Sequence, residues 1–321
     1  MNSATKEFID NICNETMGFS LGDPWRISDS SVVCIVPITR HTDQEQVYEV
    51  SSRAKDSLII EDTGNIDVAI IHNNGDLPIF FRLGEILSGS TQERSLKFSR
   101  VVPRKSTIKA DIVCVHASRP ISSGAVFKTS GYAPGREAFN MSAMYIDGNI
   151  NQSESWNRDA KYIEKLKASP SLKREVSHAL DLDALKSDDL STARDAIKNA
   201  LDDVIKKVPL FDAQVGMVLI DTSGVSLLEC FDIPLSWSDV REAIVGKEAD
   251  RLMEKDESGV FEFRPEKAKE LIRTMLSSSY DEKIINDDGH TRIVVLDGET
   301  HTGEVVVIGD QVIHLLFARK E

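Results

Sequence analysis

A glycine-rich stretch at residues 84–94 (GEILSGSTQER) brings an acid, an amide and a guanidinium close together in the sequence. These groups are Glu85, Gln92 and Arg94. The two glycines let the backbone turn sharply, and an amide beside the planar fork of an arginine suits a carboxylate, a phosphate or a ribose hydroxyl. The pattern predicts a site for a small anionic ligand. The alternative is that the same three side chains brace a long hairpin through a buried polar network.

Two histidines and a second arginine are further candidate residues for this site. His116 and Arg119 follow an apolar run at residues 112–115. They could form a second pair of anion-facing groups, because a histidine changes protonation near neutral pH, or His116 could simply be capped by a neighbour. His314 alternates with apolar residues and is predicted to be a hydrogen-bonded core histidine, with a supporting role at the ligand site as the alternative.

No metal or catalytic motif is visible. Histidines, cysteines and acids do not have the spacing of a structural zinc site, and there is no Gly-x-Ser-x-Gly elbow or Cys-His nucleophile pair. We therefore expect no metal site, while the cofactor and the question of enzymatic activity stay open. The cysteines are widely spaced, which predicts buried reduced thiols. They are Cys13, Cys34, Cys114 and Cys230.

The net charge of the chain limits the kinds of partner that can be expected. The chain has 321 residues and a formal net charge of −14, so phosphate backbones and anionic membranes would repel it, and neither is expected as a partner. The basic stretch at residues 94–109 is predicted to be a solvated strand face, with a local basic pocket as the alternative. No apolar run reaches the roughly 18 residues of a membrane helix, and no secretory signal is visible, so we expect a cytoplasmic location.

The first half of the chain has the character of a β-protein. Short runs rich in β-branched residues are separated by turns, which favours a β-sandwich. The tetrapeptide NNGD at residues 73–76 predicts a hairpin between two of these runs. The runs span residues 32–38, 67–71, 79–83, 95–102 and 107–115.

The second half combines helices and hairpins. Pro265 predicts the start of one helix, because its missing N–H costs nothing in a first turn. Two hairpins, at residues 215–231 and 304–317, resemble each other. We expect both in one sheet that the helices between them cover. Apolar periodicity predicts further helices at residues 157–168, 192–208 and 237–254.

These elements predict an α+β protein. A β-rich, sandwich-like domain is expected at residues 28–147 and an α+β lobe at residues 148–321, after an N-terminal segment at residues 1–27. A polar, glycine-containing stretch at residues 118–157 separates the two parts, which could also form one continuous domain.

The order of motifs resembles a known domain family. A Gly-Glu, a Gln-x-Arg turn, a Pro-x-x-Ser and a Cys-Val follow one another, and in that order they resemble the domain family associated with ADP-ribosylglycohydrolases and rhodanese-phosphatase proteins, a family of unknown function. The resemblance covers about residues 30–318 and includes Gln152 and Trp156 as candidate supporting residues, with a core anchor as the alternative for Trp156. The motif residues are Gly84, Glu85, Gln92, Arg94, Pro103, Ser106, Cys114 and Val115.

The chain departs from the family pattern just after Cys114. Where the family has an acid and later an aromatic residue, this chain has His116 and Pro120, while Arg119 is kept. A role that rests on that acid does not carry over. The resemblance implies an association with ADP-ribose chemistry and names no reaction.

Three functions follow from these observations. The first is binding of a nucleotide or ADP-ribose-like ligand by Gln92, Arg94, His116 and Arg119. The second is a non-catalytic interaction or scaffold module. The third is a hydrolase that acts on a phosphoester or ADP-ribosyl bond, which would need a metal or a carboxylate such as Glu85 beside a cleft.

Overall fold

The α+β class is confirmed. A computed structural model describes residues 3–89, 93–114, 123–133, 138–139, 164, 202–254 and 263–320. These contain an eight-stranded sheet, a closed barrel and a three-stranded sheet, together with helices. They divide into two compact units. Unit 1 comprises residues 1–46, 209–241 and 254–321, and unit 2 comprises residues 47–208 and 242–253.

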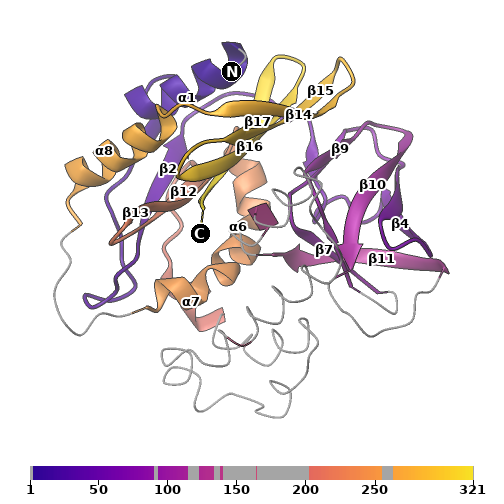
Figure 1. Ribbon diagram of the computed structural model, residues 1–321, viewed down its shortest axis with the longest axis horizontal. Helices are drawn as coiled ribbons and strands as arrows, with labels where there is room; N and C mark the ends of the chain where they lie inside the picture. The colour runs from indigo at the N-terminus through magenta and orange to yellow at the C-terminus, as the bar shows by residue number, and fades with distance from the viewer. Residues whose placement is uncertain are drawn as a thin grey trace. The chain divides into compact units, whose positions relative to one another are not determined.

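Unit 1 is built on one antiparallel sheet of eight strands (Figure 1). In sheet order these are β1 (Phe19–Leu21), β2 (Cys34–Arg40), β12 (Gln214–Asp221), β13 (Gly224–Phe231), β17 (Gln311–Arg319), β16 (His301–Ile308), β15 (Thr291–Asp297) and β14 (Asp281–Asp287). The central strands are rich in valine, isoleucine and leucine, which pack well on a pleated surface. Because β2 pairs with β12, the sheet joins the start of the chain to its last third.

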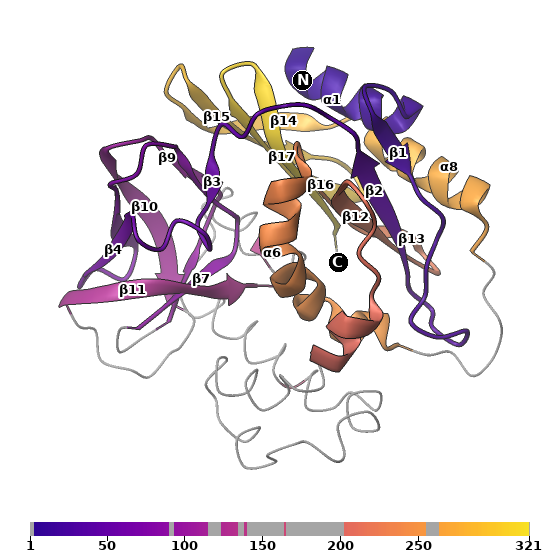
Figure 2. The same cartoon turned by 180° about the vertical axis from the view of Figure 1, so that it is seen from behind.

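Two helices cover one face of this sheet, α1 (Ser3–Asn14) and α8 (Pro265–Leu276), as Figures 1 and 2 show. Phe8 and Ile12 of α1 and Ile272 of α8 share one core cluster with alternate residues of the central strands. Pro265 is the first residue of α8, as predicted. The helix predicted at residues 237–254 occurs as α6 (Pro234–Lys247) and the short α7 (Ala249–Leu252).

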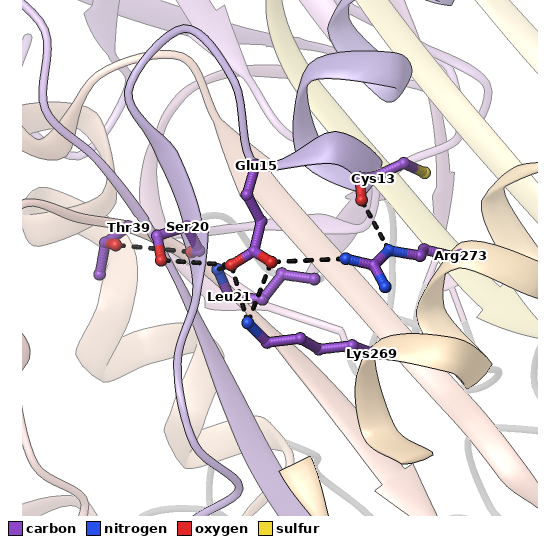
Figure 3. A network of polar contacts seen from close by, with 7 residues as sticks. All are labelled: Cys13, Glu15, Ser20, Leu21, Thr39, Lys269 and Arg273. Carbon is purple, nitrogen blue, oxygen red and sulfur yellow. Dashed lines mark hydrogen bonds and ion pairs between the residues drawn. The ribbon is translucent and has the colours of Figure 1, made fainter. Parts of the chain in front are cut away.

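A polar network at the end of α1 ties the two helices together (Figure 3). The Glu15 carboxylate accepts hydrogen bonds from Lys269 Nζ at 2.9 and 3.0 Å and from the N–H of Leu21 at 3.0 Å, and Arg273 donates to the carbonyl oxygen of Cys13 at 2.7 Å. Burial alone would raise the pKa of Glu15, but Lys269 and the Leu21 N–H outweigh it and hold that pKa below its ordinary value. These contacts offset the φ of 54° at Glu15, a conformation that costs a non-glycine residue about 1 kcal/mol or more.

The two similar hairpins lie side by side in this sheet, as predicted. β12 pairs with β13, β16 pairs with β17, and β13 joins the hairpins by pairing with β17. Helix α8, which lies between the hairpins in the sequence, covers one face of them. Gly216 marks a close approach in the first hairpin, because a Cβ there would lie 2.1 Å from the carbonyl oxygen of Glu229.

Replacing Gly216 with alanine is expected to lower the free energy of unfolding by at least about 2 kcal/mol, because the obstacle is backbone and cannot rotate away. Gly309→Ala is the matched control: Gly309 has a φ of 59°, but nothing lies within 4 Å of an added Cβ. Its cost should be about 1 kcal/mol, from the left-handed backbone alone. Urea denaturation compares the two variants, and equal losses would contradict a tight strand approach at Gly216.

Unit 2 contains a closed barrel of six strands (Figure 2). In order around the barrel these are β10 (Ser106–Cys114), β5 (Val68–Asn73), β4 (Leu58–Thr63), β11 (Ser123–Tyr132), β7 (Glu85–Ser88) and β8 (Arg94–Leu96). Two long strands close the barrel because each changes partner halfway. β10 pairs with β5 and then with β8, and β11 pairs with β4 and then with β7. The β-rich half is therefore a barrel and not the β-sandwich that the strand spacing favoured. The spacing does not distinguish the two, because short strands separated by turns occur in both architectures.

A three-stranded sheet closes the end of the barrel at which β5 ends. It consists of β3 (Glu49–Val50), β6 (Ile79–Phe81) and β9 (Arg100–Val102). Ile79, Phe81 and Val102 share one core cluster with the inward-facing residues of the barrel. The predicted hairpin at residues 73–76 is wrong, because β5 pairs with barrel strands and β6 with β3 and β9. The buried Asn73 amide donates a hydrogen bond of 3.1 Å to the carbonyl oxygen of Val102 and so directs the turn toward β9.

Candidate functional site

Arg94 lies at the end of the barrel opposite to the three-stranded sheet. It is the cross-strand partner of Leu87 in β7 and of Cys114 in β10, so the three side chains share the inner face of the barrel. In β4, Asp62 shares the inward face with the core residue Ile60, and its charge acts on Cys114. We call the region formed by Asp62, Arg94 and Cys114 the Arg94 end.

Arg94 is wholly buried, with 0% of its surface exposed, and its Nη1 contacts the sulfur of Cys114. Burial raises the pKa of the Cys114 thiol, the charge and hydrogen bond of Arg94 lower it, and the charges of Asp67 and Asp62 raise it again, so that the result is a raised value. The sulfur is therefore a neutral thiol near pH 7, and a neutral thiol is a poor nucleophile. The Arg94 end suits binding better than attack by this cysteine.

Asp62 adds a carboxylate to the Arg94 end. It is 2% exposed, and its Oδ1 accepts a hydrogen bond of 2.9 Å from the N–H of Gly64. An arginine presents planar N–H donors, whereas an ionised carboxylate only accepts hydrogen bonds. A guanidinium and a carboxylate on the same inner face therefore match a ligand that carries both an anionic group and hydroxyl groups.

Asp62 was not found from the sequence, and Cys114 was predicted to be a buried thiol and a motif residue of the family but not a site residue. A signal for Asp62 is present: Leu58, Ile60 and Asp62 alternate along β4, which puts the acid at an inward position. The run is too short and too polar to predict a strand by itself. The alternation identifies Asp62 as an inward-facing acid only when β4 is already known to be a strand.

Several cations of the basic stretch at residues 94–109 form ion pairs with acids. Lys97 Nζ lies 3.1 Å from Asp67 Oδ1, and Arg100 forms an ion pair with Asp111. These pairs reduce the local positive charge. They give no support to a basic pocket for nucleic acid.

Glu85 lies at the other end of β7, beside the three-stranded sheet. It is 1% exposed, and its carboxylate accepts hydrogen bonds from the Ser51 hydroxyl and from the N–H of Arg82, the latter at 3.2 Å. Burial raises the pKa of Glu85 to about 8, although Ser51 and Arg82 oppose the shift. Two strand positions, about 7 Å, separate Glu85 from Leu87, the partner of Arg94. Glu85 and Arg94 thus belong to separate polar clusters, and Glu85 braces a turn.

Of the remaining sequence-predicted residues, the structure describes His314 alone. His314 lies in β17 of unit 1, where its Nε2 is 3.0 Å from Oε1 of Glu229 and both side chains are 0% exposed. It is a buried, hydrogen-bonded histidine, as its alternation with apolar residues predicts. The following lie outside the described residues, and their roles stay predictions: Gln92, His116, Arg119, Gln152 and Trp156.

All four cysteines are buried and none forms a disulfide, as predicted. Among the residues with described positions, no group of three or more histidines, cysteines and acids is arranged to hold a metal ion. No helix in the same residues is long and apolar enough to span a bilayer.

Comparison with known proteins places the chain in a family. No curated protein and no solved structure matches it. A family model described as the ARG and Rhodanese-Phosphatase-superfamily-associated Protein domain matches residues 18–318. This match spans most of the chain and confirms the resemblance carried by the motifs at residues 84–115. The chain therefore belongs to the family of ARG and Rhodanese-Phosphatase-superfamily-associated Protein domains.

Proposed function

We propose that this protein binds a phosphorylated nucleoside or sugar of the ADP-ribose kind at the Arg94 end of the barrel. The observation that carries the proposal is the presence of a buried guanidinium, Arg94, and a buried carboxylate, Asp62, on one inner face of the barrel. The planar fork of an arginine matches the oxygens of a phosphate. A carboxylate accepts hydrogen bonds from ribose hydroxyls, as acids do in dinucleotide sites.

The topology of the barrel supports the same location. β7 ends and β8 begins at this end, β10 ends here, and β11 begins here. In the sequence, Gln92 stands between β7 and β8, and His116 and Arg119 stand between β10 and β11. These three residues remain predictions for the same site. Ligands commonly bind at the mouths of β-barrels, where loops surround a rigid frame.

The family name is a further, weaker support. It records an association with other proteins, and an association raises the prior for related chemistry without giving a mechanism. The raised pKa of the Cys114 thiol and the burial of Glu85 in its own hydrogen bonds do not favour covalent catalysis by either group. We therefore propose binding rather than hydrolysis.

A thermal-shift screen of the full chain tests the proposal. The panel contains ADP-ribose, NAD, ADP, AMP, ribose 5-phosphate and inorganic phosphate, with adenosine as the uncharged control. A ligand at 100 times its dissociation constant should stabilise the folded protein by about 2.7 kcal/mol, and the phosphorylated sugars should raise Tm where adenosine does not. If no phosphorylated compound shifts Tm at millimolar concentration, the proposed function is wrong.

A further inference from the structure

The turn at residues 82–85 is held by buried polar contacts at the closed end of the barrel. The carboxylate of Glu85 receives the Ser51 hydroxyl and the N–H of Arg82 at 3.2 Å. The N–H of Leu83 donates to Ser99 Oγ at 2.8 Å. Ser51 follows β3 and Ser99 precedes β9, so this turn depends on the three-stranded sheet for its hydrogen bonds.

The end of β11 and the residues after it are docked on this turn. The N–H of Ala133 donates to the carbonyl oxygen of Gly84 at 2.7 Å. Gly84 has a φ of 74°, and a Cβ there would lie 2.6 Å from Cβ of Ala138, so Ala138 packs directly on the glycine. The guanidinium of Arg82 lies 5.2 Å from the ring centre of Tyr132. The turn therefore contacts Tyr132, Ala133 and Ala138 at once.

We propose that Glu85 is a pH-sensitive latch, which in its protonated form keeps Tyr132, Ala133 and Ala138 docked on the turn and on losing its proton releases them. A neutral carboxyl can share a hydrogen bond with Ser51, because a hydroxyl both donates and accepts. An ionised carboxylate in the same place is a buried charge, and it is costly unless it is well paired. Opening the turn would expose the ionised carboxylate of Glu85 to water and so remove this cost.

Among the residues that the structure describes, the groups around Glu85 compensate this charge only in part. They are Ser51 from the segment after β3, Tyr132 as its cross-strand partner in β11, and Arg82 from the same turn. Arg82 is the charged side chain among them, and it already lies against the Tyr132 ring. Burial raises the pKa of Glu85 to about 8 even though Ser51 and Arg82 lower it.

The difference between the pKa of Glu85 in the docked turn and in the opened turn decides how docking depends on pH. In an opened, hydrated turn the pKa of Glu85 returns toward its ordinary value of 4.5. The docked form is therefore fully favoured below pH 4.5 and loses its advantage as the pH rises to about 8. Within that window each pH unit should raise the opened fraction by about tenfold. The latch does not depend on the proposed ligand.

Hydrogen exchange of the full chain, read by mass spectrometry on peptides that contain Ala133, tests the latch. After correction for the intrinsic rate of exchange, the opening constant of the wild type should rise roughly 100-fold between pH 5.5 and 7.5. Glu85→Gln, which keeps the shape of the protonated acid, should abolish this rise. Asp56→Asn is the matched control, because Asp56 is an exposed acid just before β4 in the same unit, and it should behave as the wild type.

Two results would overturn the latch: an opening constant of the wild type that does not change with pH, or an equal rise in the wild type and in Glu85→Gln. Ser51→Ala gives an independent reading if Glu85→Gln does not fold. Loss of the hydroxyl removes a donor to the ionised carboxylate, so the rise in opening should continue beyond pH 8. A rise that ends at the same pH in Ser51→Ala and in the wild type would also reject the latch.

Discussion

Glu85→Gln is expected to stabilise the protein by about 3 kcal/mol at pH 7 and by less than about 1 kcal/mol at pH 5. The reason is the difference between the pKa of about 8 in the folded protein and the ordinary value of 4.5. Between these values the unfolded chain releases the proton and the folded protein keeps it, so the wild type loses stability as the pH rises. Glutamine has no proton to lose, and its amide can replace both hydrogen bonds of the neutral acid.

Urea denaturation at pH 5, 7 and 8.5 measures this effect, and the gain should be largest at the highest pH. Asp56→Asn, at an exposed position just before β4, is again the control and should change stability by less than about 0.5 kcal/mol, as surface substitutions do. A gain that is the same at every pH would show that the effect comes from packing. A loss at every pH would show that Glu85 is ionised in the folded protein.

Features with local signals could be predicted from the sequence. Pro265 marks the start of α8, and the two hairpins, at residues 215–231 and 304–317, are visible as alternating runs joined by turns. Their placement in one sheet could also be predicted, because each hairpin alone leaves apolar faces to bury. These inferences need only residues that are close in the sequence.

Pairing between distant segments could not be predicted. β2 pairs with β12, more than a hundred residues later in the chain, and nothing in the strand Cys34–Arg40 distinguishes that partner from the nearer strands. The barrel closes because β10 and β11 each bend from one partner to another, with register shifts in β11. Such changes of partner depend on sheet twist and bulges rather than on residue pattern.

The candidate site was predicted in part. Arg94 stands out because of the glycines around it, whereas Asp62 becomes visible only when β4 is known to be a strand. Glu85 and Arg94 are near in sequence, yet they belong to separate polar clusters, because Glu85 lies in β7 two positions before Leu87, the residue that pairs with Arg94 of β8. Nearness in sequence predicts a shared site poorly when the two residues lie on paired antiparallel strands.

Arg94→Lys is expected to weaken the binding of ADP-ribose by about 10- to 150-fold. Lysine keeps the positive charge but loses the planar fork, and a hydrogen bond to a charged group contributes about 1.5–3 kcal/mol. Because Arg94 is wholly buried, the melting curve of the variant must first show that it is folded. Arg100→Lys is the matched control: Arg100 lies in β9 of the same unit, pairs with Asp111 and stands 5.7 Å from the ring centre of Phe98, away from the Arg94 end.

A second variant tests whether the ligand binds in unit 1 instead of at the Arg94 end. Unit 1 contains a cavity of about 230 Å³. Its lining includes the hydroxyl side chains of Thr222 and Ser223 and the cations of Arg264 and Lys267. Cations and hydroxyls of this kind could also hold a phosphate. Lys267→Ala removes one of these cations at an exposed position and should leave binding at the Arg94 end unchanged.

The most direct test is therefore calorimetric titration of ADP-ribose into the wild type, Arg94→Lys, Arg100→Lys and Lys267→Ala. We expect the same Kd for the wild type, Arg100→Lys and Lys267→Ala, and a Kd at least about tenfold higher for Arg94→Lys. Unchanged binding by a folded Arg94→Lys variant, or a loss confined to Lys267→Ala, would contradict a ligand site at the Arg94 end of the barrel.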